Sequence, residues 1–163
     1  MATTFHDFTM KTIDGEAKPL SDFAGKVLLV VNVASKCGLT PQYTALEELH
    51  ERYAGRGFSV LGFPCNDFAG QEPAPESEIK EFCSTNYDVS FPLFAKIHVL
   101  GGEQAPLYAF MTGQTAPPKG PGDVTWNFEK FLVDKSGHVV ARFAPGTVPL
   151  DADITAEVER ALA

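Results

Sequence analysis

Cys37 is the residue in this sequence best placed to act as a nucleophile. It stands in Asn-Val-Ala-Ser-Lys-Cys-Gly-Leu-Thr (32–40), where an apolar run ends and a helical pattern begins at about residue 41. A thiol at such a turn lies near backbone N–H groups and the positive end of a helix dipole, and Lys36 adds a full positive charge beside it. These surroundings favour the thiolate, which is the reactive form. Many lone cysteines are inert and buried, so position alone leaves both interpretations open.

The other two cysteines, Cys65 and Cys83, are widely spaced from Cys37 and from each other. There is no Cys-x-x-Cys pair and no cysteine close to a histidine in sequence, which argues against structural zinc. The four histidines are scattered along the chain: His6, His50, His98 and His138. We therefore expect no metal site and no cofactor. A static disulfide framework is not expected in a reducing compartment, which leaves inert core cysteines or redox chemistry.

Three segments contain groups that could assist a reactive cysteine. Residues 63–73 follow the end of a predicted strand, where ligands gather in open α/β sheets, and they include Gln71. Residues 126–132 hold the only tryptophan, Trp126, next to Asn127, and residues 81–84 hold Cys83 late in a predicted helix. Each has a plain alternative: a solvated amide for Gln71, a core ring for Trp126, and a small buried hydrophobe for either Cys83 or Cys65.

The elements that must position these residues alternate between strand and helix. Residues 5–20 predict a β-hairpin that turns at Asp14-Gly15. Hydrophobic spacing predicts strands at 27–34, 58–63, 93–100, 126–134 and 138–144, and helices at 41–54, 75–85, 104–112 and 151–162. Residues 113–123 form a loop with three prolines and three glycines, long enough to be functional or flexible.

This order predicts an α/β fold with a mixed central β-sheet, helices on both faces and an N-terminal β-hairpin. The run at 27–34 is almost entirely apolar, as in a central strand covered on both sides. A crossover helix joins it to a parallel neighbour, and the strands at 126–144 add an antiparallel hairpin. With 163 residues and no repeat, we expect a single domain over 1–163.

Composition excludes several classes of partner. The formal net charge is −8, which argues against nucleic acid and anionic membranes because both attract basic surfaces. The N-terminus shows neither the basic nor the apolar region of a signal peptide. The longest apolar run is far below the ~18 residues that suggest a membrane span. We expect a soluble, cytoplasmic protein.

Taken together, three blocks of this sequence resemble the signature blocks of the glutathione peroxidases. They are Asn-Val-Ala-Ser-Lys-Cys-Gly-Leu-Thr at 32–40, Gly-Phe-Pro-Cys-Asn at 62–66 with Gln-Glu-Pro at 71–73, and Trp-Asn-Phe-Glu-Lys-Phe-Leu-Val at 126–133. Their order and spacing agree, and the resemblance covers nearly the whole chain. It implies a thioredoxin-like fold, which agrees with the predicted order of strands and helices.

The resemblance also implies a role for each candidate residue. Cys37 falls where the family carries its peroxidatic selenocysteine or cysteine, and Gln71, Trp126 and Asn127 fall on the other members of its catalytic tetrad. Their amide and indole N–H groups are donors that would stabilise a thiolate without adding a competing charge. Cys83 falls where the thioredoxin-dependent branch has its resolving cysteine. Cys65 has no such role and is interpreted as structural.

The implied activity is that of a thiol peroxidase for hydrogen peroxide and for organic or lipid hydroperoxides. Cys37 would become a sulfenic acid, Cys83 would convert it to a disulfide, and thioredoxin would reduce that disulfide. Cys37 lies at the start of one predicted helix and Cys83 lies in another, so in the reduced fold they should be too far apart to form a disulfide. We therefore expect the helix at 75–85 to unwind locally during turnover. Three alternatives stay open: a peroxidase that uses glutathione directly, a sensor that passes oxidation to a partner protein, and a binding module with inert cysteines.

The sequence departs from the family blocks at a few positions. Asp67 stands where a glutamine is common, and Ala69 where a glycine is common. The insertion that tetrameric, glutathione-using members carry near residues 113–123 is missing. We therefore expect a monomer or weak dimer whose open site admits bulky lipid hydroperoxides.

Overall fold

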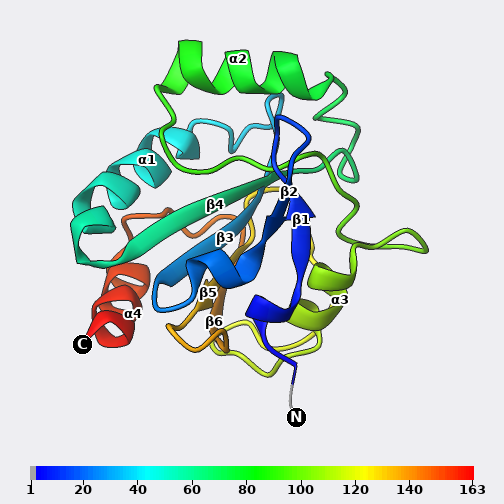
Figure 1. Ribbon diagram of the computed structural model, residues 1–163. Coiled ribbons are helices and arrows are strands. Elements are labelled where there is room, and N and C mark those ends of the chain that lie inside the picture. Colours follow the sequence, from blue (N-terminus) through cyan, green and yellow to red (C-terminus); the bar gives the residue numbers. More distant parts are fainter. Residues whose placement is uncertain (1–2) are drawn as a thin grey trace.

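A four-stranded mixed sheet forms the centre of the protein in the computed structural model, which describes residues 3–163 (Figure 1). The strands lie in the order β4-β3-β5-β6. Strands β3 (Val27–Val33) and β4 (Phe58–Pro64) are parallel, as a crossover through a helix requires. Strands β5 (Lys130–Val133) and β6 (Val139–Phe143) add an antiparallel hairpin beside β3. The mixed sheet predicted from the sequence is confirmed.

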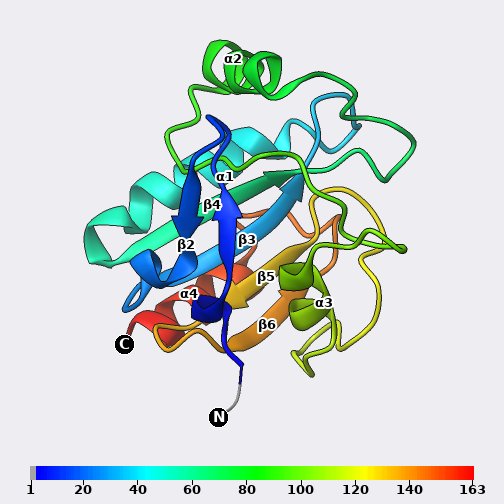
Figure 2. The same cartoon turned by 45° about the vertical axis from the view of Figure 1, so that its right-hand side comes forward.

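Helices cover both faces of this sheet. Helices α1 (Gln42–Tyr53) and α4 (Ala152–Leu162) lie on one face, and α3 (Pro106–Thr112) lies on the other with the N-terminal hairpin (Figure 2). The hairpin consists of β1 (Thr9–Lys11) and β2 (Ala17–Pro19), with short 3-10 turns at Phe5–Asp7 and Leu20–Phe23. Helix α2 (Glu76–Tyr87) stands off the sheet, beyond α1. Within residues 3–163, no helix is long and apolar enough to cross a membrane.

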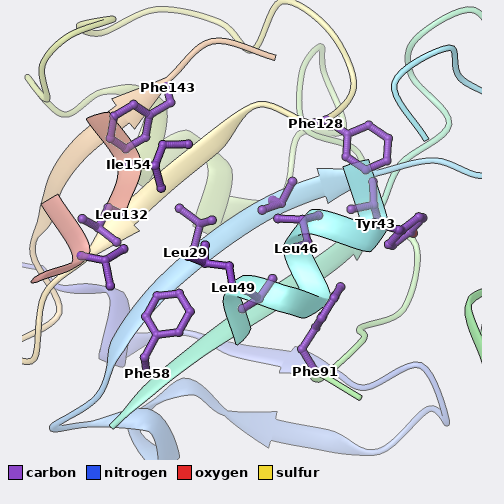
Figure 3. Packing of buried hydrophobic residues seen from close by; sticks show 14 of the residues in the cluster. Leu29, Tyr43, Leu46, Leu49, Phe58, Phe91, Phe128, Leu132, Phe143 and Ile154 are labelled. Atoms are coloured by element: carbon purple, nitrogen blue, oxygen red, sulfur yellow. The ribbon is translucent and has the colours of Figure 1, made fainter. Parts of the chain in front are cut away.

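Two hydrophobic cores result from the alternation of side chains along the buried strands. Leu29 and Leu132 point toward α1 and α4, where they pack with Leu46, Leu49 and Ile154 (Figure 3). The alternate residues of the same strands, such as Leu28 and Phe131, pack on the opposite face with α3. Burial on both faces explains why residues 27–34 read as an almost continuous apolar run.

The predicted strand at 93–100 is wrong. Only single bridges form there, between Gly62 and Leu93 and between Thr12 and Phe94. Further along, side chains take the backbone N–H groups that a ladder would need: Glu76 accepts from Lys96 N–H at 3.1 Å, and Asp67 accepts from Val99 N–H at 2.7 Å. Phe94 and Ile97 still donate to backbone carbonyls of β4, so the segment pairs with the sheet at isolated positions and forms no continuous strand.

The predicted strand at 126–134 is shorter than expected, because β5 begins only at Lys130. Phe128 has a φ of 68°, a left-handed conformation that is strained for an aromatic residue. This conformation turns the chain sharply just before the strand. Residues 126–128 therefore form a turn at the end of the sheet.

Candidate active site

Cys37 lies in a tight turn between β3 and α1 that Thr40 holds together. The Thr40 hydroxyl accepts a hydrogen bond from Cys37 N–H at 3.0 Å and donates to the Ala34 carbonyl at 2.8 Å. The Cys37 sulfur accepts from Leu39 N–H at 3.3 Å, and the residue is 8% exposed. Helix α1 begins only at Gln42, so the nearest backbone donor belongs to the turn and not to the helix.

A second turn, at residues 126–128, is anchored to the end of β3 by Asn32. The Asn32 amide donates to the Trp126 carbonyl at 3.2 Å, and Phe128 N–H donates to the Asn32 carbonyl at 2.7 Å. Asn32 is fully buried, and it is the single polar residue in the run 27–34. Its two bonds hold the strained turn and so fix the positions of Trp126 and Asn127.

Gln71 joins these two turns. The Asn127 amide donates to Gln71 Oε1 at 3.0 Å, and Lys36 N–H donates to the Gln71 carbonyl at 3.0 Å. Three segments that are far apart in sequence thus meet next to Cys37. Among the described residues, none of Gln71, Trp126 and Asn127 donates to the Cys37 sulfur. The side-chain oxygen of Gln71 accepts from Asn127, and the NH2 group of Gln71 can donate to an oxygen of a bound substrate.

Trp126 belongs both to the core and to this site. Its half-buried ring lies 5.6 Å from the Phe68 ring and packs against both hydrophobic clusters. The clusters include Cys37 on one side of the sheet and Cys65 on the other. The plain interpretation of Trp126 as a core residue is therefore compatible with a role for its indole N–H.

The three cysteines are all free, and two of them are poor nucleophiles at rest. Burial raises the pKa of the Cys65 thiol to about 12, and this cysteine packs in the core opposite Cys37. Burial raises the pKa of Cys83 to about 11; the Tyr43 hydroxyl opposes that rise and the charge of Glu72 adds to it. Cys83 lies in α2 and shares the hydrophobic cluster of Cys37.

The loop after β4 accommodates both departures from the family blocks. Asp67 Oδ1 lies 2.7 Å from His98 Nδ1, and this ion pair raises the pKa of His98 and lowers that of Asp67, although burial opposes the latter effect. Ala69 has a φ of 57°, in the left-handed region that glycine adopts without strain. Asp67 therefore ties the loop to residues 98–99.

Three residues of this region escaped the sequence reasoning: Asn32, Tyr43 and Glu72. Asn32 carried a usable signal, since a lone amide inside a buried apolar strand needs a specific partner. Glu72 is fully buried next to Gln71, and burial raises the pKa of its carboxyl group. Its burial could not be inferred from the sequence, because it lies in a loop with two prolines, where charged residues are normally exposed. In residues 3–163, no three His, Cys, Asp or Glu side chains are grouped so as to hold a metal ion.

Comparison with known proteins identifies the family of this site. The glutathione peroxidase family model matches residues 5–112. The chain belongs to the glutathione peroxidase family. It is 48% identical over 164 residues to the hydroperoxy fatty acid reductase gpx1 of Synechocystis sp., covering 98% of this chain and 96% of that protein. It is 46% identical over 173 residues to the thioredoxin/glutathione peroxidase BtuE of Escherichia coli, covering 94% of each.

Solved structures agree with this assignment. The crystal structure of Trgpx in apo form matches with a TM-score of 0.80 and 36% identity, covering 99% of this chain and 97% of that one. A thioredoxin family protein from Chlorobium tepidum matches with a TM-score of 0.67 at 20% identity, covering 96% and 93%. The predicted thioredoxin-like fold and the predicted family are confirmed. As a member of this family, the protein is a thiol peroxidase that reduces hydroperoxides.

Proposed function

We propose that the protein reduces hydrogen peroxide and organic or lipid hydroperoxides through Cys37, with Cys83 as the resolving cysteine and thioredoxin as the reductant. The observation that carries this proposal is the pair of hydrogen bonds that Gln71 accepts, one at its side chain and one at its backbone carbonyl. Its side chain binds Asn127 and its carbonyl binds Lys36, so the amides sit beside the Cys37 turn. The name of the E. coli relative, which includes both thioredoxin and glutathione, agrees with a thiol reductant.

In the first step, the Cys37 thiolate attacks the terminal peroxide oxygen. An S–O bond forms, the O–O bond breaks, and the second oxygen leaves as hydroxide or alkoxide, which takes a proton from solvent to become water or an alcohol. The Gln71 NH2 group and the Trp126 indole N–H are donors that can bear the charge that develops on the leaving oxygen. The product is the Cys37 sulfenic acid.

The second step requires α2 to open, and the packing of that helix supports such a motion. Ile79 and Cys83 are its only fully buried side chains within the described structure. Burial of Ile79 contributes about 1.5–3 kcal/mol, and Phe82 and Tyr87 of this helix are buried only in part, so local opening costs less than unfolding the whole domain. An exposed ion pair, Lys80 to Asp14 at 2.8 Å, ties α2 to the N-terminal hairpin and adds little.

Thioredoxin then exchanges with the Cys37–Cys83 disulfide and restores both thiols. Cys83 favours thioredoxin over direct reduction by glutathione, because a second protein thiol makes the disulfide that thioredoxin recognises. We further propose a single peroxidase domain over residues 1–163, acting as a monomer or weak dimer in the cytoplasm.

Mass spectrometry after one equivalent of peroxide tests this mechanism. The wild type should lose two hydrogens as the Cys37–Cys83 disulfide forms, and Cys83→Ser should instead gain one oxygen at Cys37. Cys65→Ala is the matched control and should behave as wild type. A disulfide that still forms in Cys83→Ser would show that Cys83 is not the resolving residue.

A coupled assay decides the reductant. Turnover with thioredoxin and its reductase should exceed turnover with glutathione and its reductase, and Cys83→Ser should abolish the thioredoxin-driven reaction. Faster turnover with glutathione would overturn the choice of reductant while leaving Cys37 as the peroxidatic residue.

A further inference from the structure

Glu72 is a buried carboxylate bonded to the Cys37 turn, and its charge acts on the proposed resolving cysteine. Its Oε2 accepts a hydrogen bond from the Ser35 hydroxyl at 3.0 Å, and Ser35 belongs to the turn that carries Cys37. Its backbone N–H donates to Asn66 Oδ1 at 2.8 Å. Glu72 is therefore bonded to the Cys37 turn and lies near enough to Cys83 for its charge to add to the raised pKa of that thiol.

Tyr43 is the second polar group near Cys83. It lies in the first turn of α1, six positions after Cys37, and its ring packs against Phe91 and edge-on against Phe128, 5.5 Å away (Figure 3). Tyr43 and Cys83 belong to the same hydrophobic cluster. Burial raises the pKa of the Tyr43 hydroxyl, and the charges of Cys83 and Glu72 add to that rise. Tyr43 and Glu72 thus both act on the Cys83 thiol from outside α2.

Both groups hold unused hydrogen-bonding capacity. Glu72 Oε1 and the Tyr43 hydroxyl are buried, and neither completes a hydrogen bond with any residue from 3 to 163. A buried polar atom in that condition costs about 1–3 kcal/mol, so each of these two atoms calls for an explanation. Burial has also raised the pKa of the Glu72 carboxyl group, which brings its basicity closer to that of a working base.

We propose that Glu72 is the proton acceptor for Cys83 when the Cys37 sulfenic acid is resolved, and that Tyr43 donates a hydrogen bond to the forming Cys83 thiolate. This inference rests on the proposed function, because it assigns helpers to the resolving step. The unused oxygen of Glu72 and the unused hydroxyl of Tyr43 are then the groups that act in that step.

The step balances without any other reactant. Glu72 takes the proton of the Cys83 thiol, and the Cys83 sulfur attacks the Cys37 sulfur. The S–S bond forms while the S–O bond of the sulfenic acid breaks. The departing hydroxide takes the proton from Glu72 and leaves as water, which returns the carboxylate to its starting state.

The two helpers keep their positions when α2 opens. Glu72 is bound to Ser35 and Asn66, and Tyr43 is part of α1, so neither belongs to the segment that must move. Lys96 and Lys36 are the cations whose charges act on Glu72, and both favour its ionised form. Lys96 is itself fixed by donating to the Ala74 carbonyl at 2.7 Å.

Rapid mixing with one equivalent of peroxide tests the proposal, because it separates oxidation of Cys37 from disulfide formation. In Glu72→Gln, we expect the rate constant for disulfide formation to fall about 100-fold, as for loss of a general base, and the sulfenic acid to accumulate. Oxidation of Cys37 should stay within about twofold of wild type, because the first step does not use this base. Tyr43→Phe keeps the ring and should slow resolution about 10-fold through loss of one hydrogen bond to a charged sulfur.

A pH profile distinguishes chemistry from a packing defect. In the wild type, resolution should level off once the pH exceeds the pKa of Glu72, which burial raises. In Glu72→Gln, the rate should keep rising with pH toward the pKa of Cys83, about 11, because hydroxide must remove the proton. Glu78→Gln, on the exposed first turn of α2, is the matched control and should resolve as fast as wild type.

The outcomes separate this inference from the mechanism on which it rests. Resolution at the wild-type rate in Glu72→Gln, or equal slowing of both steps, would overturn the role of Glu72. If the wild type forms no Cys37–Cys83 disulfide at all, the proposed function itself fails. Should Glu72→Gln lose its cooperative unfolding transition, Tyr43→Phe carries the test, and unchanged resolution in that variant would refute the proposal.

Discussion

Replacing Arg142 should leave a buried charge without its main partner. Arg142 and Glu129 are both almost fully buried, and Arg142 Nε donates to Glu129 Oε2 at 2.6 Å. Lys119 contacts the other carboxylate oxygen, which also accepts from Thr125 N–H at 3.1 Å. Arg142 Nη1 reaches the Gly120 carbonyl at 3.0 Å. This network fastens the loop before Trp126 to strand β6.

The expected loss follows from what remains after the change. Breaking a buried ion pair by removing one partner costs about 3–5 kcal/mol, and Lys119 still neutralises part of Glu129, which favours the lower end. Arg142 also lies over the Phe131 ring at 4.8 Å, a cation–π contact that contributes about 1 kcal/mol. Arg142→Met should therefore lower the free energy of unfolding by about 4 kcal/mol, or roughly 8–16 °C in Tm.

Urea unfolding of Arg142→Met, Glu129→Gln and the double variant measures this loss. The double variant should be more stable than the sum of the single losses predicts, because it removes both fully buried charges and leaves only the partly exposed Lys119 without a carboxylate partner. Arg160→Met is the matched control: its partner Glu157 lies on the surface of α4, so the change should cost less than about 1 kcal/mol. A loss below about 1 kcal/mol in Arg142→Met would refute the view that Glu129 depends on this partner.

Three further changes probe single features of the structure. Burial lowers the pKa of Lys130 to about 7, and its Nζ donates to the Pro145 and Thr147 carbonyls. The unfolded chain then holds one more proton than the native state between about pH 7 and pH 10, so this group raises the unfolding free energy by about 1.4 kcal/mol per pH unit. Urea unfolding at several pH values should show that Lys130→Met loses this contribution, and an identical pH dependence in both proteins would contradict it. Ala69→Gly should stabilise the protein by up to about 1 kcal/mol in thermal unfolding, because φ is 57° there, and destabilisation would count against strain at that position. Asn32→Ala should slow Cys37 oxidation about 10-fold in stopped-flow experiments, since the turn at 126–128 loses a tie worth about 1 kcal/mol; an unchanged rate would mean that the turn holds without the Asn32 amide.

Local pattern was enough to predict the helices and the central strands. The spacing of Leu46 and Leu49 marks one face of α1, and the continuous apolar run marks β3, because burial imposes these periods directly on the sequence. The segment at 93–100 failed for a non-local reason. Its Lys96 and Val99 N–H groups donate to the side chains of Glu76 and Asp67, which lie 20 or more residues away in sequence, so no local period could have revealed it.

The sequence predicted the candidate site only in part, and it did so through the resemblance of three blocks to those of the family. The types of Gln71 and Asn127 show that both can donate, but not that Asn127 donates to Gln71 in the resting protein. Nothing in the sequence indicated the left-handed backbone of Phe128, because aromatic residues rarely adopt that conformation. Strain of this kind is set by the surroundings that enforce it, here the two bonds to Asn32.

Burial also imposes an order on the reactions of the cysteines. With a pKa of about 11, roughly one Cys83 in ten thousand is a thiolate at neutral pH, so peroxide has almost no nucleophile to oxidise there. The same burial that protects Cys83 would make it too slow to resolve a sulfenic acid. A base that acts only when the two sulfurs meet would remove this conflict, and Glu72, bonded to the Cys37 turn, is the base that we propose. Protection and activation of one thiol then depend on the same few buried contacts.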